Sequence, residues 1–222
     1  MEMGLGIDIR HRIAKRAAAE IKNGMIVNLG IGIPSLIPNY VPSAVHVMFH
    51  AENGILGLGS SPPLGEEDEN VCNAAGYPTT TVQGASYCDS ATAFAMIRKG
   101  YVDMTILGAL EVSEKGDLAN WIVPGKRVPG MGGAMELAQK AKKVIVLMNH
   151  TSKTGEPKLV KTCSLPLTAS GCVGLVITDR AVFKVEKDAL LLTELMSPYT
   201  VEDILSSTEA TVRLSDQLIT IP

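Results

Sequence analysis

Residues 25–34 read Met-Ile-Val-Asn-Leu-Gly-Ile-Gly-Ile-Pro, and the fold class follows from this pattern. Residues 25–29 are rich in Ile, Val and Leu, which is typical of a buried strand. Gly30 and Gly32 then form a tight turn, and Pro34 opens a short helix over residues 35–40. A buried strand that leads through a turn directly into a helix is typical of α/β proteins.

The same alternation of helices and strands continues on both sides of this stretch. The hydrophobic pattern predicts helices at 9–21, 91–98, 134–140 and 200–206, and strands at 45–49, 79–83, 102–107, 119–123 and 144–148. Short strands with polar breaks follow at 173–178, 181–185 and 189–195, which indicates a mixed or antiparallel edge. We therefore expect one α/β domain over residues 1–222, with an open, mostly parallel sheet and helices on both faces.

Composition and charge exclude several classes of function. The chain has 222 residues, of which 46% are hydrophobic, and a net charge of −3 without a basic block, so we expect no nucleic-acid binding. It contains no run of about 20 apolar residues, so we expect no membrane span. Residues 1–10 lack the order of a signal peptide, and the four cysteines form no C-x-x-C pair. We expect a cytoplasmic protein with free thiols and no metal site.

Three glycine-rich turns are candidate ligand sites, because ligands of open α/β sheets bind near the carboxyl ends of strands. They lie at residues 30–34, 52–59 and 130–133. Only residues 52–59, Glu-Asn-Gly-Ile-Leu-Gly-Leu-Gly, carry a candidate nucleophile, Glu52. Glu-Asn-Gly is also an ordinary turn sequence, so the tripeptide alone does not decide between the two interpretations. The apolar residues that follow favour a loop packed inward around a site.

The other two turns differ in what they offer. Gly132 and Gly133 precede the predicted helix at 134–140, where free backbone N–H groups would form an oxyanion hole or phosphate cradle. A tight turn packed against a neighbour explains the same glycines equally well. Gly30 and Gly32 lack the third glycine of a dinucleotide motif, so a Rossmann nucleotide site is disfavoured.

Three further polar residues are candidates for supporting roles. His50 lies two residues before Glu52, so strand alternation places both on one face, where His50 either positions Glu52 or is a hydrogen-bonded core residue. His150 and Lys153 follow the predicted strand at 144–148. Lys153 either contacts an anionic ligand or is solvated.

Several ordered motifs together resemble one known family. They are residues 28–34, 52–59, 94–98, 116–121, 130–135 and 163–168. The chain resembles the family I coenzyme A transferases over nearly its whole length, and within them the beta subunit of the 3-oxoacid coenzyme A transferases. The fold that this resemblance implies is the layered α/β fold of these enzymes.

The resemblance also implies a mechanism and a partner. Glu52 corresponds to the nucleophile that forms a glutamyl-CoA thioester, and Gly132 and Gly133 correspond to the oxyanion-binding glycines. Asn53, Gly54, Gly30 and Gly32 are expected to contribute to binding of the oxyanion or of coenzyme A. The family uses no metal or redox cofactor, since the coenzyme A thioester is a substrate. A homologous alpha subunit is expected as an obligate partner, in an α2β2 assembly.

Departures from the family pattern leave the acid substrate open. Ser60-Ser61-Pro62-Pro63 replaces the usual Gly-Pro-x-Pro, and Asn149-His150 replaces Glu-His. Acetoacetate with succinyl-CoA is the expected pair, and another 3-oxo or short-chain acid is the alternative.

Two other functions also stay open at this point. One is a related sugar-phosphate isomerase with Glu52 as a base and a basic phosphate pocket, although no Lys or Arg lies near Glu52 in the sequence. The other is a non-catalytic supporting subunit.

Overall fold

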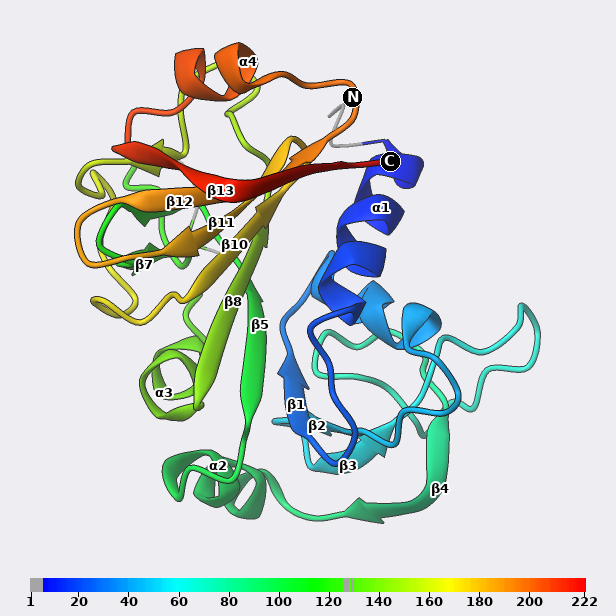
Figure 1. The fold of residues 1–222 in the computed structure, drawn as a ribbon. Coiled ribbons are helices and arrows are strands. Elements are labelled where there is room, and N and C mark those ends of the chain that lie inside the picture. The colour runs from blue at the N-terminus through cyan, green and yellow to red at the C-terminus, as the bar shows by residue number, and fades with distance from the viewer. Residues whose placement is uncertain (1–5, 126–127, 129) are drawn as a thin grey trace.

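The computed structural model describes residues 6–125, 128 and 130–222 (Figure 1). The helices are α1 (Ile7–Ala18), the 3-10 helix η1 (Pro34–Tyr40), α2 (Ser90–Arg98), α3 (Ala134–Lys140) and α4 (Val201–Ser206). The strands of the main sheet are β1 (Ile26–Leu29), β2 (Met48–Ala51), β3 (Ile55–Leu58), β4 (Thr81–Tyr87), β5 (Met104–Gly108), β8 (Lys143–Met148), β10 (Leu175–Thr178), β11 (Ala181–Val185), β12 (Leu190–Met196) and β13 (Val212–Ile221). A small second sheet contains β6 (Glu111–Ser113), β7 (Leu118–Ala119) and β9 (Leu159–Val160).

The main sheet has ten strands in the order β13-β12-β11-β10-β8-β5-β1-β2-β3-β4. The central five, from β10 to β2, are all parallel to one another. Both edges are mixed, because β11 runs antiparallel to β10 and β12, and β3 runs antiparallel to β2 and β4. The predicted α/β class and the mixed edge after residue 173 are therefore confirmed. The sequence did not predict the second antiparallel edge, at β3 and β4.

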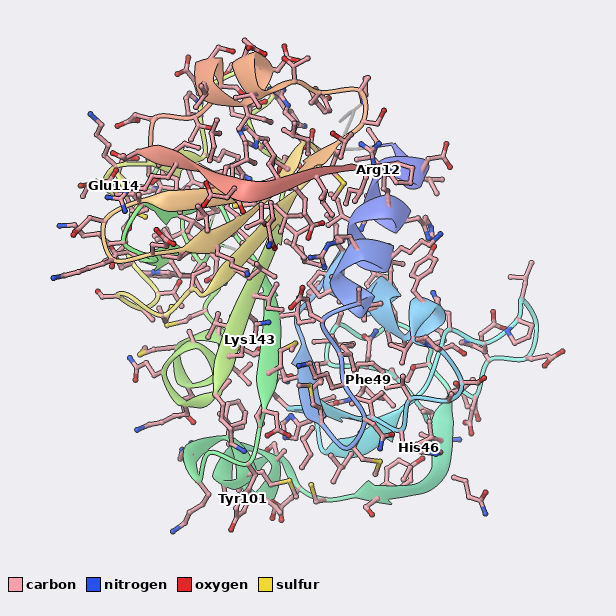
Figure 2. All side chains as sticks on the ribbon, in the orientation of Figure 1. Arg12, His46, Phe49, Tyr101, Glu114 and Lys143 are labelled. Atoms are coloured by element: carbon pink, nitrogen blue, oxygen red, sulfur yellow. The ribbon has the colours of Figure 1, made fainter. Side chains whose placement is uncertain are left out.

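Helices cover both faces of the sheet, as expected (Figure 1). Successive side chains of β8 point to opposite faces of the sheet and belong to two different hydrophobic cores. Val144 and Val146 pack on the face with α2, α3 and α4, whereas Ile145 and Leu147 pack on the face with α1 and η1. Strands of a parallel sheet that are buried on both faces carry such continuous apolar runs. Side chains fill the space between the layers (Figure 2).

Helix α1 is anchored to the far edge of the sheet by charge. The guanidinium of Arg16 donates from Nε to Glu194 on β12 over 2.6 Å, and its Nη1 pairs with Glu20 at 2.9 Å. Glu20 also accepts from Lys143 at the start of β8, over 2.7 Å. Because these groups are half-buried, water screens their interactions only in part. In the described part of the chain, no helix is long and apolar enough to cross a membrane.

Candidate active site

Glu52 is the first residue of a three-residue turn that joins β2 to β3. Ala51 pairs with Ile55 across this hairpin, and the N–H of Gly54 donates to the carbonyl of Ala51 over 3.0 Å. Gly54 has a φ of +105°, which suits the last position of a three-residue hairpin loop. The expected inward-packed loop is therefore wrong in one respect. Residues 55–58 form a strand, whose Ile55 and Leu58 are each only 6% exposed.

The glycines of this motif allow β4 to lie close to the hairpin. A Cβ on Gly54 would be 1.9 Å from the carbonyl oxygen of Cys88, and one on Gly57 would be 3.0 Å from the Cα of Ala85. Any larger residue at Gly54 would therefore displace the backbone of the neighbouring segment. The structure gives Gly54 a packing role, and its contact with the oxyanion or coenzyme A stays a prediction.

Asn53, by contrast, is exposed. Its side-chain Nδ2 donates to the carbonyl of Cys72 over 2.9 Å, which ties the turn to residues 71–78. Its side-chain amide is thus already engaged beside Glu52.

The turn before α3 lies directly against Glu52. A Cβ on Gly133 would be 3.1 Å from Oε1 of Glu52 and 3.1 Å from the ring of Phe94. Three elements therefore meet here: the β2–β3 turn, α2 and the N-terminus of α3. The structure thus brings together two motifs, residues 52–59 and 130–133, that are far apart in the sequence.

Glu52 itself is half-buried, and its Oε2 atom is buried without a hydrogen-bond partner among the described residues. A buried carboxylate oxygen without a donor is costly, so it calls for an explanation such as a catalytic role. Nearby donors exist in the backbone. Among the described residues, the amides of Gly132 and Gly133 donate no hydrogen bond, so both are available to an oxyanion.

His50 is a buried core residue beneath Glu52. Its Nε2 lies 3.1 Å from the carbonyl of Ala93 on α2, and its Nδ1 lies 3.3 Å from Nδ2 of Asn28. The hydroxyl of Thr105 donates in turn to Oδ1 of Asn28 over 3.2 Å. Burial lowers the pKa of His50, although the charge of Glu52 acts in the opposite direction. His50 is therefore neutral at pH 7 with the proton on Nε2, an assignment that follows from its acceptor, Ala93.

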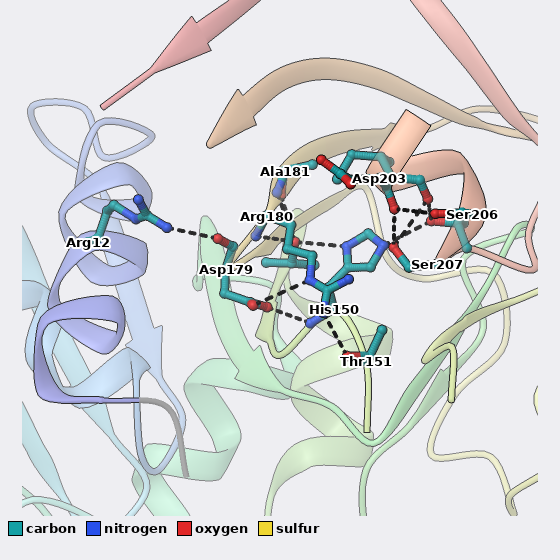
Figure 3. Close-up of polar contacts among 12 residues, drawn as sticks. Arg12, His150, Thr151, Asp179, Arg180, Ala181, Asp203, Ser206 and Ser207 are labelled. Carbon is teal, nitrogen blue, oxygen red and sulfur yellow. Dashed lines mark hydrogen bonds and ion pairs between the residues drawn. The ribbon is translucent and has the colours of Figure 1, made fainter. Parts of the chain in front are cut away.

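His150 lies elsewhere and is also structural. Its backbone N–H donates to Asp179, its Nδ1 lies 3.1 Å from the hydroxyl of Thr178, and its Nε2 lies 2.9 Å from that of Thr208 (Figure 3). Burial lowers the pKa of His150 to about 3. Strands β5 and β1 separate β8, which precedes His150, from β2, which precedes Glu52. Three strand spacings amount to about 14 Å.

Lys153 follows His150 in an exposed turn on the β8 side of the sheet. The structure thus does not bring His150 or Lys153 to Glu52. A position just after a strand was weak evidence for a functional residue, because every parallel strand of the sheet has a carboxyl end.

Gly30 and Gly32 border a cavity of about 490 Å³ at the carboxyl end of β1. The N–H of Gly30 donates to the carbonyl of Ile106 over 2.8 Å, and a Cβ on Gly30 would be 3.1 Å from the same oxygen. Ala51 also lines this cavity, but Glu52 does not, because the two residues point to opposite faces of the hairpin. The carboxylate and this cavity therefore lie on either side of one strand end.

Phe94 and Arg98 belong to the family motif at residues 94–98, but the sequence alone gave neither residue a role at the site. The guanidinium of Arg98 lies 5.7 Å from the centre of the Phe94 ring and pairs with Glu136 at 2.9 Å. The signal was the spacing of four residues on α2, which places both on one face. The charge of Arg98 is therefore paired with Glu136. A phosphate pocket of the isomerase type gains no support from it.

In the described part of the chain, no group of three or more His, Cys, Asp or Glu side chains is placed so that it could hold a metal ion.

Comparison with known proteins adds independent findings. The sequence model of the family described as coenzyme A transferase matches residues 10–207. A Bacillus subtilis (strain 168) protein, named as the probable beta subunit of a coenzyme A transferase, is 62% identical over 212 residues, which cover 96% of this chain and 98% of that protein. A second protein of the same strain is named as the probable B subunit of a succinyl-CoA:3-ketoacid coenzyme A transferase. It is 52% identical, also over 96% of this chain and 98% of that protein.

A solved structure shares the fold. The crystal structure of an acyl-CoA transferase apoenzyme from Escherichia coli O157:H7 matches with a TM-score of 0.79 and 22% sequence identity. The match covers 100% of this chain but only 45% of that one, so this chain spans less than half of its length. At such low identity the similarity concerns the fold alone.

Proposed function

The chain belongs to the coenzyme A transferase family, and from that premise we propose that it moves coenzyme A between an acyl-CoA and a carboxylic acid, with Glu52 as the covalent nucleophile. One observation carries this proposal. The carboxylate of Glu52 lies against the backbone of Gly133, and its Oε2 is buried without a donor among the described residues. Structural carboxylates are normally satisfied by hydrogen bonds, whereas a nucleophile needs a lone pair that no donor occupies.

The proposed reaction begins with attack on the thioester. A carboxylate oxygen of Glu52 adds to the acyl carbonyl, the C–S bond breaks, and the coenzyme A thiolate leaves behind a mixed anhydride. The thiolate then attacks the side-chain carbonyl of Glu52 and releases the acyl group as a free carboxylate. A glutamyl-CoA thioester remains. The acceptor carboxylate runs the same steps in reverse, so no net proton, electron or water is needed.

Each addition step creates a negative oxygen that requires donors. The amides of Gly132 and Gly133 are our proposed donors, because they precede α3 beside Glu52 and have no other acceptor among the described residues. Preorganised donors of this kind are effective because they need no rearrangement during the reaction. The loss of one typically raises the barrier by about 3 kcal/mol.

The substrates and the partner belong to the same proposal. The name of the Bacillus subtilis relative with 52% identity supports succinyl-CoA as donor and a 3-oxoacid such as acetoacetate as acceptor. Gly30 and Gly32, at the cavity of about 490 Å³, are proposed to contact coenzyme A. Coenzyme A held away from the reacting carbonyl contributes binding energy that the transition state can use. Both relatives are named as subunits, which supports an alpha subunit as the partner. The α2β2 assembly is part of the proposal.

Borohydride trapping tests the proposed mechanism. The chain is co-expressed with its partner, and the complex is treated with borohydride, which reduces a glutamyl thioester, with and without acyl-CoA. We expect inactivation only when acyl-CoA is present. Glu52→Gln is expected to lack transferase activity, whereas Glu66→Gln, at an exposed glutamate, is expected to behave as the wild type. Full resistance to borohydride, or turnover by Glu52→Gln, would refute Glu52 as the nucleophile.

A further inference from the structure

A second cavity lies where the chain changes direction across the sheet. It measures about 480 Å³ and is bordered by residues 31–34 after β1, residues 108–109 at the end of β5 and residues 147–149 at the end of β8. In the sheet, β1 lies between β2 and β5. From β1 the chain first adds β2 on one side, and it later adds β5 on the other side, so the strand order reverses at β1. In open α/β sheets, crevices at such switch points hold ligands. The volume is within the range of small-molecule sites.

Two cationic side chains line this cavity. Lys158 reaches it just before β9, and its Nζ donates to the carbonyl of Ala109 over 3.2 Å. Arg10 reaches it from the first turns of α1. Neither side chain forms an ion pair with another side chain that the structure describes. The cavity therefore carries positive charge that an internal ion pair does not neutralise.

The environment of Lys158 is unusual for a lysine. Burial lowers the pKa of Lys158 to about 8, although the charges of Asp179 and Glu111 act to raise it. Both carboxylates are already engaged elsewhere. Asp179 accepts from the backbone of His150 over 2.6 Å, and Glu111 accepts from the backbone N–H of Ser164 over 2.7 Å. A half-buried ammonium without a dedicated carboxylate, in a cleft, is a candidate functional group.

Arg10 connects this cavity to the one beside Gly30. Arg10, Ile31 and Gly32 line both cavities, so the two share one wall. Guanidinium groups bind carboxylates and phosphates through two parallel hydrogen bonds, and the ammonium of lysine acts as a compact point charge for the same groups. An anion held between the two would gain from both.

We propose that the cavity lined by Lys158 and Arg10 binds a small oxyanion, a carboxylate or a phosphate group. Two sources of that chemistry exist: the free carboxylate of the acid substrate, and a phosphate of coenzyme A. The site itself stands on the cavity and its two cations, whereas the choice between these sources rests on the proposed function.

Direct binding measurements on the assembled complex without acyl-CoA test the proposal. Isothermal titration at pH 7 uses acetoacetate, inorganic phosphate and adenosine 3′,5′-bisphosphate as probes. We expect at least one probe to bind, and Lys158→Met to weaken its binding about tenfold, since a charge-assisted hydrogen bond is lost. Tighter binding of acetoacetate identifies the acid as the source, and tighter binding of the bisphosphate identifies coenzyme A.

Two further variants keep the test decisive. Arg10→Gln, at an exposed position of α1, retains the core and is expected to weaken the same probe. Lys161→Met removes an exposed lysine that does not line the cavity and is expected to leave binding unchanged. Binding of none of the three probes, or wild-type affinity in both Lys158→Met and Arg10→Gln, would overturn the proposal.

The pH dependence of probe binding provides a further check, because a purely structural lysine would not produce it. Lys158 is cationic below its pKa of about 8, so binding of the probe should weaken as pH rises through that value. Lys158→Met should lose this dependence.

Borohydride trapping separates this proposal from the proposed function. Trapping without probe binding would refute only the anion site, and probe binding without trapping would refute only the role of Glu52.

Discussion

Glu52 and Gly133 lie so close together that a Cβ added to Gly133 would be 3.1 Å from the carboxylate oxygen Oε1 and 3.2 Å from Cγ of Glu52. These distances are shorter than ordinary carbon contacts. This close approach explains why a glycine is needed before α3, and it couples the proposed nucleophile to the proposed oxyanion donors. Any movement of one residue therefore changes the geometry of the other.

Gly133→Ala should reduce turnover with little loss of stability. The added methyl group would press on Glu52 and on the ring of Phe94. Displacement of a catalytic group by about 1 Å can lower the rate about 100-fold. Steady-state kinetics of the complex and thermal unfolding check this expectation. Gly6→Ala is a suitable control, because a Cβ there meets no atom within 4 Å. Unchanged turnover in Gly133→Ala would contradict the coupling.

Glu52→Gln should stabilise the folded subunit while it removes activity. The buried Oε2 has no donor among the described residues, and a neutral amide is less costly to desolvate than a carboxylate. We expect the free energy of unfolding to rise by about 1 kcal/mol. Urea denaturation at pH 7 measures it. A clear loss of stability would indicate that the carboxylate has a structural partner instead.

Asp103→Asn should destabilise the protein more at pH 7 than at pH 3. The carboxylate of Asp103 accepts from the N–H of Ile26 over 2.8 Å and from Lys142 over 2.7 Å, and these contacts lower its pKa. Because the folded pKa lies below the unfolded one, the stabilisation is present above the unfolded pKa and is lost as pH falls through the folded pKa. Denaturation curves of both proteins at the two pH values check this. Equal differences at both would refute it.

His150→Gln should flatten the acid side of the stability profile. Burial lowers the pKa of His150 to about 3, so the unfolded state takes up a proton before the folded state does. Wild-type stability should then fall by up to about 1.4 kcal/mol per pH unit, from near pH 6 down to about pH 3, through this group alone. The free energy of unfolding, measured from pH 7 to pH 4, should show a weaker slope in the variant. Parallel slopes would show that His150 does not carry the effect.

Much of the fold could be predicted from the sequence, because buried parallel strands and amphipathic helices have strong hydrophobic patterns. Helix α3 begins and ends where predicted, and β8 differs by one residue. Strand β3 was mistaken for a loop because glycines interrupt its apolar residues, although these glycines serve close packing against β4. Strand β13 was not predicted, since residues 212–221 are mostly exposed and lack an apolar run. Hydrophobic patterns report burial, so β13 escaped them, whereas the equally exposed edge strand β4 was found in part, at 79–83, through its β-branched residues.

The candidate site was predictable only in part, for a related reason. The family resemblance singled out Glu52 and Gly133, and the structure brings them together. Phe94 was quoted only as part of a motif, because a contact across two elements leaves no periodic signal. His150 follows a strand end and is nevertheless structural, since its three hydrogen bonds depend on residues distant in the sequence.

Covalent attachment of coenzyme A to Glu52 is the central claim, and peptide mass spectrometry tests it most directly. The assembled complex is incubated with succinyl-CoA without an acceptor acid, then digested under conditions that preserve thioesters. We predict a coenzyme A adduct on the peptide that contains Glu52, and its disappearance when acetoacetate is added. An adduct on another residue, or continued turnover with no adduct at all, would contradict the account.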